Sequence, residues 1–241
     1  MFFNLIKLPF RNLLSKIYNY SKIYSDAYLI NSYLKQYNIS TVIDIGANSG
    51  QYAISLRRFG YKKKIISFEP QKKPYKKLLK NAANDEKWII HERVAIGQKN
   101  KTEKIYNSKN SVSSSIKRIN NLHVSAEPKS KIIGSEKIIV IKLDEIFNQY
   151  YKKNDNILLK IDTQGYEYEV LRGALKSLKS IKLIQVELSF LKLFKKQLNW
   201  LDILCFLEKK NFRVIKCLDG FKDKKNNEVL QIDCILKNNK L

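Results

Sequence analysis

Short apolar runs alternate with helical patterns from residue 41 to the end of the chain. Helical periodicity fits residues 51–59, 72–83, 143–150, 166–176 and 197–210. The apolar runs predict seven strands, over residues 41–45, 64–68, 88–92, 157–161, 181–186, 212–216 and 229–236. Because strands alternate with helices, we expect an α/β fold with a mostly parallel sheet and helices on both faces. Ligands of such sheets bind beyond the carboxyl ends of the strands, so the polar residues there are the candidates for function.

Residues 1–38 precede this alternation and have a pattern of their own. Apolar and aromatic residues recur at helical spacing with basic residues between them, which predicts a basic amphipathic helix or helix pair. We favour a lid helix that packs on the main domain, residues 39–241. The alternative is attachment of residues 1–25 to an anionic membrane surface.

Residues 99–136 interrupt the alternation of strands and helices. The segment is rich in Lys, Ser and Asn, and connections of this length inside compact domains are usually functional lids or mobile segments. We predict a lid or substrate loop, in which Ser113, Ser114 and Ser115 could hydrogen-bond a polyhydroxylated substrate. A mobile surface loop is the alternative.

The chain is strongly basic. Of its 241 residues, 46 are Lys or Arg and 22 are Asp or Glu, which gives a net charge of +24, while 44% are hydrophobic. The hydrophobic content predicts a globular core, and the charge indicates an anionic partner such as nucleic acid, a membrane or a phosphorylated substrate. Lys, Asn and Ile are all abundant, so a coding bias that places lysines on a solvated surface would explain the same composition.

The cysteines indicate a reducing compartment. Their number is odd and no two have CxxC spacing, so a disulfide scaffold and a zinc site are both disfavoured. Cys205, Cys217 and Cys234 each lie among apolar residues, which predicts core packing. No uninterrupted apolar run approaches about 18 residues, and no signal peptide is evident. We expect a cytoplasmic protein, or one peripheral to the inner face of the membrane if residues 1–25 attach to lipid.

A glycine turn follows the first predicted strand, in the sequence IDIGANSG at residues 43–50. The helix that begins there presents free N–H groups, which attract an anion. Dinucleotide enzymes have G-x-G-x-x-G at this place, but Asn48 stands where the middle glycine should be, which disfavours a dehydrogenase. S-adenosylmethionine (SAM) needs less, and Asp44 suits its ammonium group or a water bound to it. Glu69 ends the next strand, where an acid can accept hydrogen bonds from both hydroxyls of an adenosine ribose.

Two further strands deliver charged side chains to the same edge. Lys160 and Asp162 share one side of the fourth predicted strand, and Glu187 ends the fifth. The two carboxylates could act as a base and its orienting partner, or as hard oxygen ligands for a divalent cation. The structural alternative is that Lys160 only neutralises one of them.

Taken in order, the segments DIGANSGQ, FEP, RVAIG, LLKIDTQGYEYEVLRGA and VEL resemble the FkbM family of SAM-dependent methyltransferases, over about residues 41–190. The resemblance implies a Rossmann-like class I methyltransferase fold with a seven-stranded sheet whose last strand is antiparallel. It also implies SAM as cofactor and O-methylation, often of a sugar hydroxyl on a glycan, glycolipid or natural product.

The resemblance also implies roles for individual residues. Asp162 would face the substrate, Glu69 would hold the ribose, and Gln164 stands where the family commonly has a glutamate. An amide is a poor cation ligand, so this departure disfavours a metal site, although Gln164 could still touch the substrate. The remaining residues would line the methionine part of SAM (Asp44, Gly46, Asn48 and Gly50) or border the adenine (Glu92, Val94 and Ala95).

Two other classes of function are alternatives. A nucleic-acid methyltransferase is suggested by the charge, but base N-methylation usually shows [DNS]-P-P-[YF] where this chain has DTQG, and no cysteine lies nearby for C5-pyrimidine chemistry. Ribose 2′-O-methylation of RNA remains open. A non-catalytic nucleotide-binding module is disfavoured by the three acids at one edge. His91 is expected to be a strand residue, and His123 a weak candidate base in the lid.

Overall fold

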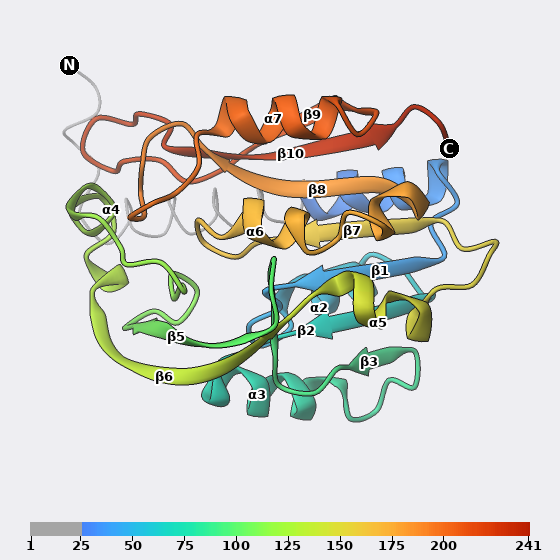
Figure 1. Ribbon diagram of the computed structural model, residues 1–241, viewed down its shortest axis with the longest axis horizontal. Helices are drawn as coiled ribbons and strands as arrows, with labels where there is room; N and C mark the ends of the chain where they lie inside the picture. Colours follow the sequence, from blue (N-terminus) through green and yellow to red (C-terminus); the bar gives the residue numbers. More distant parts are fainter. Residues whose placement is uncertain (1–25) are drawn as a thin grey trace, which may run out of the picture.

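The computed structural model describes residues 26–241 (Figure 1). A seven-stranded sheet has the order β3-β2-β1-β7-β8-β10-β9, and β10 is antiparallel to both of its neighbours. The prediction of a mostly parallel sheet whose last strand is antiparallel is therefore confirmed. The strands are β1 (Thr41–Ile45), β2 (Lys64–Phe68), β3 (Trp88–Ile90), β7 (Ile157–Ile161), β8 (Ile181–Ser189), β9 (Phe212–Asp219) and β10 (Gln231–Asn238).

The two strands at the centre of the sheet are β1 and β7, and all five residues of each are buried. They pair in parallel, in a register that sets Asp44 beside Lys160. A strand buried on both faces has little room for charge unless two opposite charges meet. The sequence therefore places an acid and a base side by side in the middle of the sheet, just under its carboxyl edge.

Helices cover both faces of the sheet, as predicted. On one face α2 (Gln51–Arg58), α3 (Lys72–Ala82) and a helical stretch over residues 26–36 bury their apolar sides in a common cluster. On the other face α5 (Leu143–Tyr150), α6 (Glu167–Arg172) and α7 (Trp200–Glu208) contribute to a second, larger cluster. A short 3-10 turn, η3 (Ser177–Ser180), leads into β8.

A second sheet begins and ends the segment that the sequence predicts as a loop. It has three strands in the order β4-β6-β5: β4 (Ala95–Ile96), β5 (Lys101–Ser108) and β6 (Ile132–Ile141). Between β5 and β6 lie α4 (Asn121–Ala126) and the turn η2 (Pro128–Ser130). Residues 99–136 are thus largely ordered in regular elements. Their strands escaped prediction because only two residues of β5 and two of β6 are buried, so apolar and polar positions do not alternate cleanly.

The cysteine prediction is correct for one residue of three. Cys234 is buried, whereas Cys205 and Cys217 are exposed, because the apolar residues around them in sequence turn inward while the thiols do not. Cys217 and Cys234 face each other across β9 and β10, with 3.4 Å between the sulfur atoms. Within residues 26–241 no helix is long and apolar enough to cross a membrane. The predictions for residues 1–25 lie outside the described residues.

Candidate active site

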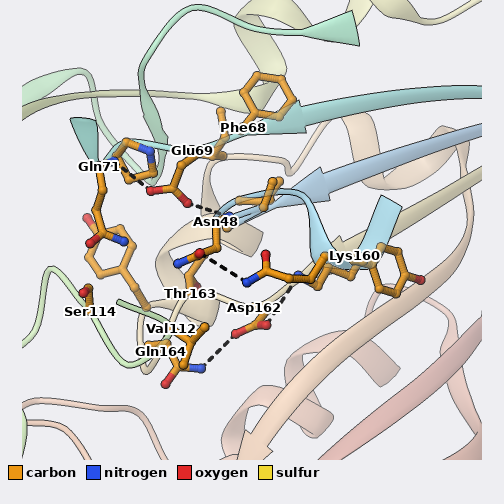
Figure 2. A pocket seen from close by; sticks show the side chains of 18 of the residues that line it. Asn48, Phe68, Glu69, Gln71, Val112, Ser114, Lys160, Asp162, Thr163 and Gln164 are labelled. Carbon is orange, nitrogen blue, oxygen red and sulfur yellow. Dashed lines mark hydrogen bonds and ion pairs between the residues drawn. The ribbon is translucent and has the colours of Figure 1, made fainter. Parts of the chain in front are cut away.

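A cavity of about 470 Å³ lies at the carboxyl ends of the parallel strands (Figure 2). Its walls come from the loops after β1, β2 and β7, from α2, from β4 and the residue before it, and from single residues of β8, β9 and β10. Residues 111, 112 and 114–116, in the connection between β5 and β6, border it on one side, and Asp26, Ala27 and Ile30 border it from the helical stretch that precedes β1. This is the position at which open α/β sheets bind their ligands.

The turn after β1 forms one wall, and it is held in an unusual conformation. Gly46 and Asn48 have positive φ angles of 81° and 50°, in the left-handed region that non-glycine residues rarely adopt. A methyl group on Gly46 would overlap the backbone oxygen of Asp162, so only glycine lets this turn approach the end of β7. Asn48 also joins the turn to the connection between β5 and β6, since its Nδ2 donates to Ser111 Oγ at 3.3 Å.

Glu69, directly after β2, is buried and lines the cavity. Its Oε2 accepts from the backbone N–H of Asn48 at 2.8 Å, and its Oε1 accepts from the N–H of Gln71 at 2.7 Å. A carboxylate has about four acceptor positions, so each oxygen can accept one more hydrogen bond. Burial raises the pKa of Glu69 to about 7. The hydrogen bonds from the two N–H groups act in the opposite direction and limit this rise.

Lys160 lies between two carboxylates. Its Nζ is 3.1 Å from Asp44 Oδ1 and 3.4 Å from Asp162 Oδ2, and it lies 5.2 Å from the centre of the Tyr52 ring. Burial alone would lower the pKa of Lys160, but the two carboxylates together raise it, so the ammonium stays charged. Burial raises the pKa of Asp44, against the effect of Lys160. Asp44 is completely buried, so it acts on the cavity through Lys160.

Gln164 connects the two carboxylates that the sequence predicts at this edge. Its Nε2 donates to Asp162 Oδ1 at 2.8 Å and to Glu187 Oε2 at 2.9 Å. Burial, and then the charges of Asp162 and Asp233, raise the pKa of Glu187 well above its ordinary value. The amide thus stands where a cation shared by these carboxylates would stand. Among residues 26–241 no group of three or more His, Cys, Asp or Glu is arranged to hold a metal ion.

Glu167 holds the loop that carries Asp162 and Gln164, and the sequence gives no hint of this role. Its buried Oε1 accepts from the N–H and the hydroxyl of Thr163 and from the N–H of Gly165, at 3.0 to 3.2 Å. The loop needs this support because Gln164 has a positive φ of 56°. Burial raises the pKa of Glu167 to about 7.

Two more acids line the cavity, and sequence reasoning missed both. Asp233 comes from β10, and burial, followed by the charge of Asp162, raises its pKa to about 6. Asp26 comes from the helical stretch over residues 26–36. Nothing in the sequence marks them, since Asp233 lies inside an antiparallel strand rather than at a strand end. With Asp162 they give this part of the cavity an acidic wall, in contrast to the basic surface of the protein.

The other predicted residues fall into two groups. Val94, Ala95, Ser114 and Ser115 line the cavity, together with the residues described above. Five predicted residues lie outside its wall: Asp44, Gly50, Glu92, Ser113 and Glu187. Ser115 also fastens the second sheet to the site, since its Oγ donates to the backbone oxygen of Gln164 at 2.6 Å.

The two histidines do not line the cavity. His91 stacks on Phe68, with 4.9 Å between the ring centres. His123 is buried beside Phe194 and Phe221, and burial lowers its pKa to about 4. Its interpretation as a base is therefore wrong, because the ring lies in an apolar pocket away from the cavity.

Comparison with known proteins adds one result that bears on function. The model of the methyltransferase FkbM domain matches residues 44–214. A search of curated protein sequences finds no significant match.

Distant similarities to solved structures are also found. A magnesium protoporphyrin IX methyltransferase from Synechocystis, with bound SAM, is 10% identical over 89% of this chain and 78% of that one, with a TM-score of 0.47. An rRNA methylase from Streptococcus thermophilus is 10% identical over 87% of this chain and 94% of that one, with a TM-score of 0.46. We draw no conclusion about the acceptor from similarity of this degree.

Proposed function

The chain belongs to the FkbM-domain methyltransferases, and we propose that it transfers the methyl group of SAM to a hydroxyl of a sugar in a glycan, glycolipid or related saccharide. The observation that carries the proposal is Asp162, a half-exposed carboxylate on the cavity wall that Lys160 and Gln164 hold in place. A weakly acidic hydroxyl needs such a group within hydrogen-bond reach as its proton leaves.

The cofactor side of the cavity fits SAM. The free acceptor positions of Glu69 suit the two ribose hydroxyls, and the turn at Gly46 and Asn48 offers backbone groups to the methionine part. Val94 and Ala95 provide an apolar border for the adenine. When bound, SAM supplies a methyl group that its sulfonium makes electrophilic.

The residues of this chain then have separate tasks in the transfer. Asp162 accepts the proton of the acceptor hydroxyl, while Lys160 and Gln164 fix the carboxylate so that one oxygen faces the acceptor. Glu187, held by the same amide, orients Gln164 and so acts on the acceptor indirectly. Alignment of the acceptor oxygen with the methyl group supplies much of the remaining rate acceleration, because holding two reactants in line makes their reaction effectively unimolecular.

Ribose 2′-O-methylation of RNA is the second candidate, and the net charge of +24 favours it. The acidic wall of Asp26, Asp162 and Asp233 argues against it, because the phosphates that flank a target ribose would have to approach these carboxylates. A neutral saccharide meets no such repulsion, and its hydroxyls can donate to the same acids.

The proposed function is tested with SAM that carries a labelled methyl group. The protein is incubated with the saccharide, glycolipid and RNA fractions of a strain that lacks this chain. We expect label in a saccharide or glycolipid fraction. Label in RNA alone would replace the proposal with the second candidate.

Replacing Glu69 with alanine should weaken the binding of SAM and of its demethylated product. The ribose would lose a charged acceptor, at a cost of about 1.5–3 kcal/mol for hydrogen bonds to a charged group. Titration calorimetry on both ligands measures the change. Glu92→Ala is the matched control, because Glu92 is exposed and lies outside the cavity wall. Equal affinity in the Glu69→Ala variant and the wild type would contradict the ribose assignment.

SAM binding should also weaken as the pH falls through 7. The pKa of Glu69 is raised to about 7, so the carboxylate that accepts the ribose hydroxyls is charged above this pH and neutral below it. If only the charged form binds, the apparent affinity changes about tenfold between pH 8 and pH 6. The same titrations on Glu69→Gln should show weak binding with little of this pH dependence. A wild-type profile as flat as that of the variant would rule out Glu69 as the titrating group.

A further inference from the structure

The helices α2 and α3 on one face of the sheet differ in charge from α5, α6 and α7 on the other. The helices α2 and α3 contain seven Arg and Lys residues and no Asp or Glu, whereas α5, α6 and α7 contain six Asp and Glu residues and one Arg. A coding bias toward lysine would act on both faces alike. The asymmetry therefore belongs to this fold and not to the composition alone.

Five lysines of α3 form what we call the lysine stripe. Pro74, Leu78 and Ala82 are buried on the inner side of the helix, and the lysines project on the opposite side, where all five are exposed. None of the five forms an ion pair among the described residues. Of the acids around α3, Asp85 pairs with Arg57, while Glu136 pairs with Arg93 and accepts from the backbone N–H of Lys72, so neither pairs with a lysine side chain of the stripe. The stripe consists of Lys72, Lys73, Lys76, Lys77 and Lys80.

The stripe is unfavourable for the helix that carries it. Lysines four positions apart repel each other, and Lys72 and Lys73 lie in the first turn, where the helix dipole favours acids. The first turns of α5, α6 and α7 do carry acids, so they follow the rule that α3 breaks. Glu136 supplies one carboxylate to this turn from outside the helix, but the repulsion among the five lysines remains. An anionic partner would relieve that repulsion, and a local rule broken in this way points to a function.

We propose that the face formed by α2 and α3 binds the anionic surface of a lipid membrane, with the lysine stripe as its main contact. Apolar side chains favour a membrane over nucleic acid. Leu79 beside the stripe is 45% exposed, Ile54 of α2 is 36% exposed, and Tyr28 on the same side of the sheet is 69% exposed. Apolar and aromatic side chains among lysines suit the headgroup region of a bilayer. There the apolar groups can contact the acyl chains while the lysines contact the anionic headgroups.

The position of the cavity supports the same orientation. Gln51 begins α2 and Gln71 immediately precedes α3, and both line the cavity. In Figure 1 α3 lies at the β3 end of the sheet, and its first turn adjoins the carboxyl edge. Contact through α2 and α3 would hold the cavity close to the membrane surface, so a glycolipid headgroup could reach it. This link to the acceptor rests on the proposed function, whereas the binding of the face to the membrane does not.

The test compares two variants of the full chain that lose the same charge. In one, the five lysines of the stripe become glutamine, which has a similar helix propensity. In the matched control, five exposed lysines outside α2 and α3 become glutamine, namely Lys152, Lys153, Lys176, Lys179 and Lys209. Sedimentation with vesicles of phosphatidylcholine, with and without phosphatidylglycerol, measures the partition of each protein at low and moderate salt.

We expect the wild type to bind only the vesicles that contain phosphatidylglycerol, and the binding to fall with salt. The stripe variant should bind them at least about 100-fold more weakly, since the loss of five surface lysines would weaken binding by up to roughly 10³–10⁴-fold, and the control should stay close to the wild type. Equal losses in the two variants, unchanged binding by the stripe variant, or no vesicle binding by the wild type would each overturn the proposal. So would tighter binding of the wild type to RNA than to the anionic vesicles.

Ligand binding at the cavity distinguishes a failure of this proposal from a failure of the proposed function. Both variants should bind the demethylated product of SAM as the wild type does, because no substituted lysine lines the cavity. If the wild type binds anionic vesicles through the stripe but transfers no methyl group to a saccharide, the membrane contact stands and the proposed function fails.

Discussion

Replacing Asp162 with asparagine should reduce the turnover of methyl transfer by roughly 10²–10⁴, the usual effect of a positioned acid or base. Asparagine keeps the shape of the side chain and can still accept a hydrogen bond from Gln164, but it cannot take a proton. Binding of SAM should stay nearly unchanged, because Glu69 and the turn after β1 are untouched. Single-turnover transfer of a labelled methyl group to the responding fraction measures the rate, and calorimetry measures the affinity.

A control variant distinguishes the loss of the base from damage to the rest of the site. Glu187→Gln removes the other carboxylate that Gln164 contacts, but this residue lies outside the cavity wall. It should lower turnover much less than Asp162→Asn does. If the asparagine variant methylates its acceptor at the wild-type rate, Asp162 has a structural role and the proposed mechanism is wrong. If a chelator abolishes the activity of the wild type, a cation shared by Asp162 and Glu187 should replace the simple base.

The Gly46→Ala variant should be the least stable of the single substitutions considered. The φ angle of 81° costs a non-glycine residue roughly 1–2 kcal/mol, and the new methyl group would overlap the backbone of Asp162, which typically adds about 1–3 kcal/mol. The free energy of unfolding should therefore fall by about 2–5 kcal/mol. Urea unfolding measures this loss, and calorimetry should show weakened SAM binding in any variant that still folds.

Gly60→Ala provides the comparison. Gly60 has a φ of 91°, but nothing lies within 4 Å of the position that a Cβ would take. This variant should lose only the backbone part, roughly 1–2 kcal/mol, and should bind SAM normally. Equal losses in the two variants would mean that the close approach of the turn to β7 is unimportant.

The sequence predicts the central sheet well because its strands are short, apolar and separated by clear helices. The acids at the strand ends are found for the same reason, since a polar residue after a buried strand must emerge at the carboxyl edge. Glu69 and Asp162 are examples, and both line the cavity. The resemblance to the FkbM family then supplies the cofactor, which the glycine turn alone leaves open.

The remaining features depend on contacts between distant parts of the chain. Asp233 becomes a cavity residue only because β10 runs antiparallel beside β8 and turns that side chain toward Asp162. The role of Gln164 depends on Glu187, 23 residues later, which its amide contacts together with Asp162. Asp44 lies at the end of β1 as the sequence predicts, but it does not line the cavity. Its pairing with Lys160 holds it beneath the cavity wall. Patterns of apolar and polar residues do not encode such pairings.

The most direct test of the account identifies the atom that receives the methyl group. The product labelled from SAM is hydrolysed to monosaccharides, and mass spectrometry with NMR locates the label. We expect a methyl ether on a ring hydroxyl of a sugar, formed far more slowly when Asp162→Asn replaces the wild type. Label found as a methyl ester, on nitrogen, or on a nucleoside would contradict it.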